Sequence, residues 1–506
     1  MNSKATDLRT SENENSEKNF VKNWFNRYVI AEKLNNVFGF IIMSVLIAAI
    51  SFLITNQGTD LGILLIGLFV GIPLVIYCII NYEFAILFLL AFSFFLNGVS
   101  RFVENVQLGA LLDTLLYLLF FILIIKQFKY KNWSFIHHPV GYLVLAWILF
   151  NILQLVNPDS TSKEAWMYTI RSIAGLLIIY YLVSYSLKSI EFVEKIFRIW
   201  IFLAFLAAIY GLYQEFIGFQ KFELDWIMKD EARFKLLYNW GRFRMISYFN
   251  DPTVFGILMA YSSVFCFVLA AGDFTLRKRI WYIVAGSLMM FAMVYSGTRT
   301  AFAILPAGFA FYAMLTLNRK TLIVSGVFLA LGLILIFGPF RSLGPISSNN
   351  LARIRSAFTF EEDRSFQFRL EKQAFIQPYI RSHPFGAGLG STGSWGQRFS
   401  PNTLLATFGP DSGYVRTAVE QGWGGLLLFC TMLFIGMATG IRNYFKVKDP
   451  RLKTYYIAVL TVLYCLIVAN YPQQAIIMYP TVLIFYICLA LAIKMIDLEP
   501  SLKKTK

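Results

Sequence analysis

The sequence predicts an all-α protein that crosses a membrane many times, and three observations lead to this prediction. Hydrophobic residues make up 57% of the 506 residues, whereas charged residues make up only 15%. The mean hydropathy is +0.60, which lies outside the range of soluble globular domains. Apolar runs of about 17 to 25 residues, long enough to cross a bilayer as helices, recur along the whole chain. We therefore expect a helix bundle whose core lies in lipid.

We count fourteen candidate spans and expect about fourteen transmembrane helices, within a range of twelve to fourteen; the third candidate is short, which leaves thirteen as an alternative. The candidates centre on residues 37–55, 61–80, 84–99, 106–125, 139–156, 166–187, 197–217, 252–271, 280–296, 300–317, 321–339, 412–440, 453–470 and 475–494.

The charges of the loops predict the orientation, because short cytoplasmic loops are enriched in Lys and Arg. With the N-terminus inside, the alternate loops, among them KQFKYKNW (126–133) and RNYFKVKDPRLK (442–453), are all basic. Loops of the opposite set, such as TNQGTD (55–60) and NYPQQ (470–474), hold few positive charges. We therefore expect both termini in the cytoplasm, and the long polar segment that follows residue 339 outside.

These assignments divide the chain into seven parts. They are a cytoplasmic tail (1–36), which lacks the features of a secretory signal, N-terminal transmembrane helices (37–217), an extracytoplasmic loop (218–251), central transmembrane helices (252–339), a large extracytoplasmic catalytic loop (340–411), C-terminal transmembrane helices (412–495) and a second cytoplasmic tail (496–506).

Charge and cysteine usage limit the chemistry. Much of the net charge of +16 belongs to the inner loops, so we assign it to topology and to anionic lipid headgroups and expect no nucleic-acid partner. The five Cys lie in apolar stretches without a CxxC pair or a neighbouring His. This pattern predicts neither a disulfide framework nor a zinc site, and we expect no metal and no cofactor.

The polar segment 340–410 is the most informative feature of the chain. It contains RIRSAFTFEEDRSFQFRLEKQ (353–373) and RSHPFGAGLGSTG (381–393). Long connections inside membrane proteins are usually functional or disordered, and this one is too rich in Phe, Arg and regularly placed Gly to be disordered. We therefore expect the chemistry of this protein to take place at this segment.

Two arginines lie at the outer ends of spans and are flanked by Gly, Ser or aromatic residues: Arg244 in GRFRMISYFNDP and Arg299 in SGTRTA. A guanidinium group is permanently charged and offers a planar fork of donors that matches phosphate oxygens. Arg171 lies inside a span and fits either function or anchoring at the interface. Asp113 lies deeper and has no obvious partner, so we expect a structural hydrogen bond there.

Four segments in this order resemble the O-antigen ligase and O-antigen polymerase superfamily of bacterial envelope glycosyltransferases. They are GRFRMISYFNDPTVFGILMAY (241–261), MVYSGTRTAFAILPAG (293–308), FRLEKQAFIQPYIRSHPFGAGLGS (368–391) and DSGYVRTAVEQGWGGLLLF (411–429). The resemblance covers roughly residues 200 to 445. It implies a bundle of the GT-C type with a large loop over the site, in the bacterial cytoplasmic (inner) membrane.

The resemblance also implies an activity: transfer of a glycan from an undecaprenyl diphosphate-linked oligosaccharide donor to a sugar hydroxyl of a glycan acceptor, outside the membrane and without metal. The arginines of the family correspond to Arg244 and Arg299, which would hold the diphosphate leaving group. Either Arg364 or Arg369, in RSFQFR, would join the acceptor or phosphate site.

One position departs from the ligase pattern. Ligases of this family typically begin the helix after the large loop with His and Asn, and here the matching pair is Asp411 and Ser412. Asp411 could orient the acceptor hydroxyl or accept its proton, although an ordinary Asp pKa near 4 makes a weak base. Because polymerases of the family often carry an acidic residue here, we favour a polysaccharide (exopolysaccharide) polymerase, which leaves room for a chain-length regulator as a partner. Asp411 also fits a simple helix N-cap.

Other residues keep two interpretations. His383 in SHPFGAGLG is a second candidate base, and the glycines after it fit either a tight turn or a phosphate cradle. Arg416 fits an i,i+4 pair with Glu420 or a phosphate ligand, and Tyr414 lies beside it as a candidate substrate contact. The alternatives to a polymerase are an O-antigen ligase, with lipid A core or a protein as acceptor, and a lipid-linked oligosaccharide flippase, which would need more charge inside the membrane.

Overall fold

The computed structural model describes residues 59–102, 107–239, 241–319 and 364–499, together with isolated helical residues within 40–52 and 322–330. The chain forms two compact units. One contains residues 1–85 and 121–132, and the other contains residues 86–120 and 133–506. In the first unit, the described part includes helix α3 (Thr59–Ile80). The second unit carries the candidate site residues and is described below.

Eleven helical segments of the described chain are long and apolar enough to cross a membrane, which confirms the prediction of an all-α multi-pass membrane protein. They are α4 (Tyr82–Ser100), α5 (Leu108–Tyr130), α6 (Pro139–Leu153) with the 3₁₀ turn Gln154–Val156, α7 (Lys163–Ile173) with the 3₁₀ turn Gly175–Leu177 and α8 (Ile178–Ser186), α9 (Ile190–Phe216), α12 (Pro252–Ala271), α13 (Leu276–Ser296), α14 (Arg299–Thr316), α19 (Gly413–Lys446), α20 (Pro450–Ala469), and α21 (Thr481–Lys494) with the turn Met495–Leu498.

These eleven segments match eleven of the fourteen candidate spans, including the short third one. The candidate at 61–80 coincides with α3. The candidates at 37–55 and 321–339 lie outside the described residues, apart from isolated positions, so the count of fourteen stays a prediction.

The helices begin where the sequence supplies caps. Asp251 and Asp449 accept hydrogen bonds from the backbone N–H groups of Thr253 and Arg451, and in both helices a proline occupies the first helical position. An N-cap carboxylate satisfies N–H groups that have no partner inside the helix, and proline has no N–H to satisfy. These caps fix the first residues of α12 and α20.

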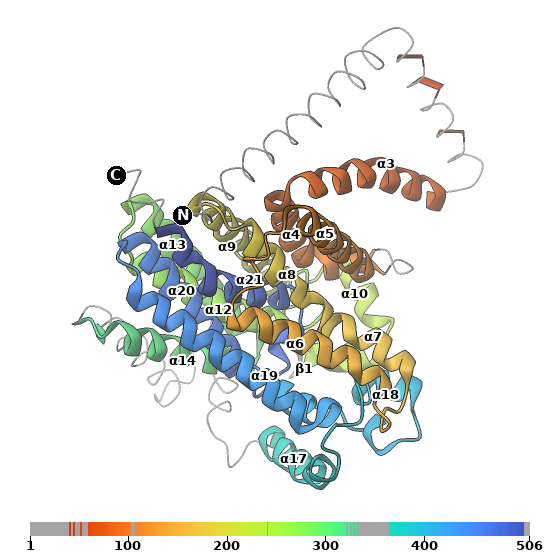
Figure 1. The fold of residues 1–506 in the computed structure, drawn as a ribbon. Coiled ribbons are helices and arrows are strands. Elements are labelled where there is room, and N and C mark those ends of the chain that lie inside the picture. The colour runs from red at the N-terminus through yellow and green to blue at the C-terminus, as the bar shows by residue number, and fades with distance from the viewer. Residues whose placement is uncertain are drawn as a thin grey trace. The chain divides into compact units, whose positions relative to one another are not determined.

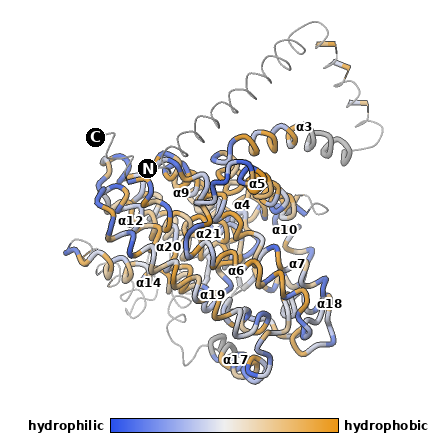
Figure 2. Tube along the Cα trace, viewed as in Figure 1, coloured by the Kyte–Doolittle hydropathy of each residue, from blue (hydrophilic) through white to orange (hydrophobic). Residues whose placement is uncertain are grey.

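Helices α12, α20 and α21 form the centre of the second unit (Figure 1). The buried share of their apolar windows is 89%, 72% and 83%, against 39% for α13. α12 packs against α9, α13, α14 and α20, whereas α21 packs against α8, α19 and α20. In Figure 2, α5 has the orange of hydrophobic residues along much of its length, whereas the chain around α18 has more of the blue of hydrophilic residues.

The connections that carry the site are largely folded. Residues 218–251 contain α10 (Lys221–Met228), α11 (Glu231–Leu237) and an antiparallel hairpin of β1 (Tyr238–Asn239) and β2 (Arg242–Phe243). Residues 364–411 contain α17 (Arg364–Ser382), α18 (Gly393–Phe399) and the 3₁₀ turn Leu404–Ala406. Helix α17 ends directly before His383, and residues 340–363 lie outside the described part.

Candidate active site

Arg244 holds the turn that leads into Arg299. Its Nε donates to the carbonyl of Ser296 over 3.1 Å, and its Nη2 donates to the carbonyl of Gly297 and to Thr298 Oγ1, both over 3.3 Å. Gly297 adopts φ 63°, ψ 24° at the end of α13, a left-handed conformation that glycine adopts without strain. Arg299 is the first residue of α14. The two arginines predicted to act together therefore lie at one turn.

This turn concentrates positive charge. Burial lowers the pKa of the Arg244 guanidinium below its ordinary value, the carboxylate of Asp251 opposes this shift, and the positive charge of Arg299 adds to it. Thr298 Oγ1 donates to the carbonyl of Pro252 over 2.9 Å, so the N-termini of α12 and α14 lie side by side. Helix N-termini carry partial positive charge. Two guanidinium groups and two helix N-termini together favour a bound anion.

A buried network fixes the chain that follows Arg244. Arg101 forms an ion pair of 3.0 Å with Glu223 and donates to the carbonyl of Ser247 over 3.0 Å. Gln214 Nε2 donates to Glu223 over 2.7 Å, and its Oε1 accepts from the N–H of Ser247 over 2.7 Å. Ser247 has φ 51°, which is costly for a residue other than glycine. The network thus holds a strained loop beside the arginine pair.

Asp411 is exposed and directly precedes α19, whose N-cap is Ser412. The Ser412 hydroxyl accepts from the N–H of Val415 over 3.4 Å. The interpretation of Asp411 as the N-cap is therefore wrong: the next residue takes the capping position, and the Asp411 side chain keeps an exposed position at the start of the helix.

The residues around Asp411 are held by a series of polar contacts. The ion pair predicted between Arg416 and Glu420 is present, with 3.2 Å between Nε and Oε1. Arg416 Nη1 donates to Gln474 Oε1 over 2.8 Å. Gln474 Nε2 in turn donates to the carbonyl of Pro410, the residue before Asp411. Arg416 is therefore engaged inside the protein, and it supports the segment that carries Asp411.

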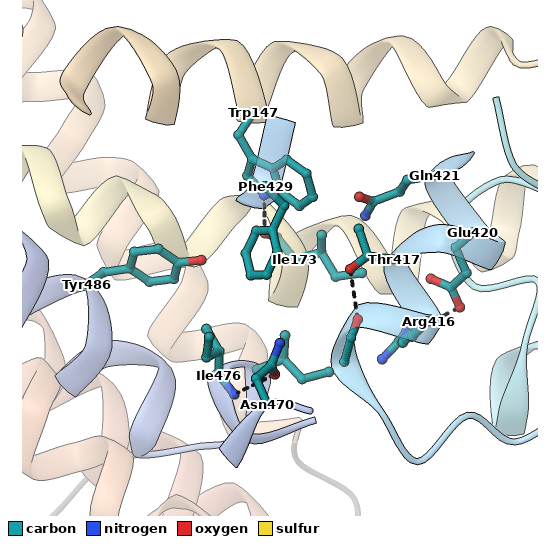
Figure 3. Close-up of a pocket in the computed structure, with 12 residues that line it drawn as sticks. Trp147, Ile173, Arg416, Thr417, Glu420, Gln421, Phe429, Asn470, Ile476 and Tyr486 are labelled. Carbon is teal, nitrogen blue, oxygen red and sulfur yellow. Dashed lines mark hydrogen bonds and ion pairs between the residues drawn. The ribbon is translucent and has the colours of Figure 1, made fainter. Parts of the chain in front are cut away.

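This series of polar contacts begins in the glycine-rich segment 384–393. Thr392 Oγ1 donates to Glu420 Oε1 over 2.6 Å. Glu420 is fully buried, and its Oε2 has no hydrogen-bond partner among the described residues; the same holds for Oε1 of the buried Gln421. A small cavity of about 30 Å³ adjoins both side chains and is also lined by Trp147, Asn470 and Tyr486, among others (Figure 3). It has room for one or two water molecules, which would satisfy these oxygens.

The glycine-rich segment 384–393 packs against a break in α19. Gly422 has φ 68°, ψ −169°, and the N–H of Trp423 donates to the carbonyl of Pro384 over 3.0 Å. The N–H of Ala387 donates to the carbonyl of Val419 over 2.9 Å. A Cβ atom on Gly386 would lie 2.4 Å from the nitrogen of Gly422. These contacts support the tight-turn interpretation of the glycines, because their space is filled by protein.

Helix α20 brings Arg299 and Asp411 to one end of the bundle. Near the start of α14, the carbonyl of Ile304 contacts the thiol of Cys465 near the end of α20, with 3.8 Å between S and O. Just after that end, the carbonyl of Asn470 accepts from the N–H of Gly413 over 3.0 Å. The first turns of α14 and α19 therefore flank the last turn of α20. We call this end of the second unit the site end.

Four further candidates occupy other positions. The His383 ring stacks on Tyr379 with 4.0 Å between centroids, and its Nδ1 lies 3.0 Å from the carbonyl of Tyr379. The Tyr414 hydroxyl donates to the carbonyl of Ile467 over 2.9 Å. Arg364 and Arg369 belong to α17, and their side chains lie outside the described part.

Asp113 has a partner that the sequence did not reveal. Arg171 Nε lies 2.9 Å from Asp113 Oδ2, and the hydroxyl of Tyr479 donates to Oδ1 over 2.9 Å. The expected hydrogen bond is thus present, and its partners are residues that were not obvious from the sequence. A carboxylate and a guanidinium paired inside the membrane-spanning segments cross-link α5 and α7.

The sequence interpretation missed Arg101, although a signal was present. Arg101 lies one residue after the end of α4 in GVSRFV, with Gly, Ser and Phe nearby, which is the pattern that identified Arg244 and Arg299. Glu223 and Gln214 gave no such signal, because only the fold brings them to Arg101.

Comparison with known proteins finds a family match. Residues 284–430 match the model of a family described as O-antigen ligase. This match supports the resemblance of residues 284–430 to the O-antigen ligase and polymerase superfamily. No curated protein matches the chain.

The matched residues 284–430 include Arg299, α17, the glycine-rich segment and Asp411, whereas Arg244 precedes them. The contacts of Arg244 to the turn at 296–298 cross this boundary, whereas Arg101 and the segment that it supports after Arg244 both precede residue 284. Residues that precede the matched region therefore contribute contacts at the site end.

Proposed function

We propose that this protein is a polysaccharide polymerase. It transfers a glycan from undecaprenyl diphosphate to the sugar hydroxyl of another lipid-linked repeat unit on the outer face of the cytoplasmic membrane, with both termini in the cytoplasm. The observation that carries the proposal is the position of Arg244 and Arg299 at one turn, at the same end of α20 as the exposed Asp411.

The arginine pair supports the binding of a diphosphate. Nη1 of Arg244 has no hydrogen-bond partner among the described residues, while Nε and Nη2 hold the turn. One side of its fork is thus available to an anion, and Arg299 supplies a second guanidinium. Charge that builds on the leaving oxygen is stabilised most by donors that are already in place. Metal is not needed for this step, because the arginines neutralise the charge.

Asp411 supports activation of the acceptor. Its carboxylate orients the acceptor hydroxyl and takes its proton as the hydroxyl oxygen attacks the anomeric carbon of the donor. The bond between that carbon and the diphosphate oxygen breaks, and undecaprenyl diphosphate leaves with the bonding electrons. One glycosidic bond forms as one sugar–phosphate bond breaks, and the single displacement inverts the anomeric centre. Arg364, Arg369, His383 and Tyr414 remain candidates for contacts to the sugars.

An O-antigen ligase is the second candidate, and the description of the matching family favours it. Ligase and polymerase share the donor chemistry and differ only in the acceptor. A flippase has less support, because the two charged groups Asp113 and Arg171 pair with each other instead of lining a polar path.

The test is a gel assay with the purified full chain and a lipid-diphosphate repeat unit as the sole substrate. We expect a ladder of extended lipid-linked glycans for the wild type and its loss in Asp411→Asn and Arg299→Ala. Asp273→Asn and Arg319→Ala are matched controls, because both residues are exposed and lie at the far ends of α12 and α14.

Each result of the gel assay has a distinct meaning. A ladder that both site variants lack supports the polymerase. No ladder, but transfer once a lipid A core or a protein acceptor is added, supports the ligase. No transfer to any acceptor, with movement of the lipid-linked glycan across vesicles, contradicts both and supports the flippase.

A further inference from the structure

An aromatic cluster lies where α18 packs against α7 (Figure 1). It consists of Tyr168 on α7 and of Trp395, Arg398 and Phe399 on α18. The Tyr168 ring stacks on Trp395 with 4.8 Å between centroids and on Phe399 with 5.4 Å, and the ring planes are inclined by 18° and 19°. Trp395 and Phe399 are 6.0 Å apart and inclined by 17°. All three rings are only half-buried, so they form one partly exposed surface of nearly parallel rings.

The glycine-rich segment fixes this surface. Gly390 has φ 76°, and a Cβ atom on it would lie 2.5 Å from Thr169 Oγ1 and 2.7 Å from the carbonyl oxygen of Ala165. Only glycine lets the segment approach α7 this closely. Helix α7 is itself held to α6, because Trp166 Nε1 donates to the carbonyl of Asn151 over 2.9 Å. The rings are therefore in place before a ligand arrives, which lowers the entropic cost of binding.

Arg398 adds a positive charge at the edge of the rings. Its guanidinium carbon lies 5.2 to 5.9 Å from the three ring centroids. By comparison, the guanidinium of Arg233 lies 3.8 Å over the Trp226 ring, in contact with its face. Arg398 is exposed and has no ion-pair partner among the described residues. Its donors are thus available to an anionic group that lies on the rings.

The surroundings of the cluster are polar. Aromatic residues and arginines also gather at the level of lipid headgroups, so the neighbouring side chains decide between lipid and water. The exposed residues of α18 are Ser394, Gln397 and Arg398, and Figure 2 shows the hydrophilic colour there. These side chains suit a surface in contact with water and not with acyl chains.

Hydrogen bonds join the cluster to the segment that carries Asp411. The N–H of Gly393, the first residue of α18, donates to the carbonyl of Phe408 over 3.0 Å. Phe408 is three residues before Asp411, so their Cα atoms lie at most about 11 Å apart. Thr392 Oγ1 also donates to Glu420 on α19. The cluster is therefore placed to contact sugars beyond the one that reacts at Asp411.

We propose that the aromatic cluster binds an acidic sugar of the acceptor glycan; the inference rests on the proposed function. The C–H face of a pyranose ring packs on the aromatic surface, whose π-electrons attract C–H groups. The carboxylate of a uronic acid accepts hydrogen bonds from the guanidinium of Arg398. A neutral sugar uses the rings alone, so the cluster distinguishes acidic from neutral glycans.

The test compares two soluble probes on the full chain in nanodiscs: a tetramer of β-1,4-linked glucuronate and a tetramer of β-1,4-linked glucose. The two probes differ in their carboxylates. Titrations followed by saturation-transfer NMR, with empty nanodiscs as the blank, give both dissociation constants. We expect the glucuronate tetramer to bind about tenfold more tightly. This comparison uses the wild-type chain alone, so it does not depend on how a variant folds.

Substitutions then assign the binding to the cluster. Arg398→Gln should weaken the binding of the glucuronate tetramer about tenfold and change that of the glucose tetramer little, whereas Trp395→Ala should weaken both. Arg381→Gln and Trp281→Ala are matched controls, because Arg381 is exposed on α17 and Trp281 is 40% exposed on α13, and neither belongs to the cluster.

The gel assay connects the binding to glycan transfer. The glucuronate tetramer should compete with the acceptor and reduce the ladder more than the glucose tetramer does. Equal affinity of the two tetramers, no binding of either, an equal loss in Arg381→Gln, or binding that leaves the ladder unchanged would overturn the inference. Binding of the glucuronate tetramer that Arg398→Gln weakens, in a chain that transfers glycan to no acceptor, would instead reject the proposed function and leave the acidic-sugar site standing.

Discussion

The two parts of the candidate site are built differently. At the proposed donor side, Arg244 and Arg299 bring positive charge together at one turn, and a buried ion pair of Arg101 and Glu223 supports the neighbouring loop. At the acceptor side, Asp411 is an exposed carboxylate, and the segment that carries it is held through the neutral amide of Gln474. The first arrangement favours an anion that stays in place, whereas the second leaves the carboxylate accessible to an incoming hydroxyl.

The difference explains how one end of a helix bundle could serve two substrates. A diphosphate needs a fixed array of donors, because stabilisation of the leaving oxygen depends on groups that do not have to move. A growing glycan acceptor has to arrive and depart in every cycle, so its site has to stay open. Each of the following predictions separates the donor side from the acceptor side.

The largest effect is expected for Asp411→Asn. An amide cannot take the acceptor proton, so kcat should fall by about 10²–10⁴, while KM for the donor changes little. Steady-state glycan transfer at varied donor concentration measures both constants. Asp273→Asn should behave as wild type, and an unchanged kcat in Asp411→Asn would remove Asp411 from the mechanism.

Arg299→Ala should lower kcat by about 10²–10³, because it removes a preformed donor to the leaving oxygen. Unlike Asp411→Asn, it should also weaken donor binding. Arg299→Lys should recover part of the activity, whereas Arg244→Lys should not, because an ammonium group cannot reproduce the three contacts that Arg244 makes to residues 296–298. Equal recovery by both lysine variants would contradict a holding role for Arg244.

Glu223→Gln tests the support on the donor side. It leaves the Arg101 guanidinium buried without a counter-charge, and breaking such a pair costs about 3–5 kcal/mol. We expect a clearly lower unfolding temperature in detergent, measured by differential scanning fluorimetry, together with weaker donor binding. Glu231→Gln is the control, because its side chain is 80% exposed. A melting curve equal to that of wild type would show that the pair does not stabilise the loop.

Gln474→Leu tests the support on the acceptor side and should have the smallest effect. It removes the contacts to Arg416 and to the carbonyl of Pro410, at a cost of about 1 kcal/mol, which corresponds to roughly a fivefold fall in kcat. In the Asp411→Asn background the same change should have no further effect on kcat. An equal fall in both backgrounds would show that Gln474 does not act through Asp411, and Gln473→Leu is the neighbouring control.

The sequence predicted much of the fold because bilayer thickness imposes a length on every span. The candidates at 252–271 and 139–156 agree with the observed helix limits. The sequence did not predict the break at Gly422 or the 3₁₀ turn within 163–186, because neither interrupts the apolar pattern. At the break, the N–H of Trp423 donates to the carbonyl of Pro384. This contact joins two segments that are far apart in the sequence.

Candidate residues and local contacts could be predicted where the sequence carried a strong local signal. Arginines beside Gly and Ser at span ends pointed to Arg244 and Arg299, and the i,i+4 spacing gave the pair of Arg416 and Glu420. The partners of Asp113 and Arg101 were not predictable, because Arg171 and Glu223 are far away in the sequence and only packing brings them into contact.

The central claim is that the arginine pair binds the donor and that Asp411 acts on the acceptor. Its most direct test is the equilibrium affinity of the same lipid-diphosphate glycan for wild type, Arg299→Ala and Asp411→Asn, measured by microscale thermophoresis in nanodiscs without an acceptor. We predict that Arg299→Ala binds the donor at least tenfold more weakly, since each factor of ten corresponds to about 1.4 kcal/mol, and that Asp411→Asn binds it as wild type does while failing to transfer. Equal losses of donor affinity in both variants would contradict this division of the site.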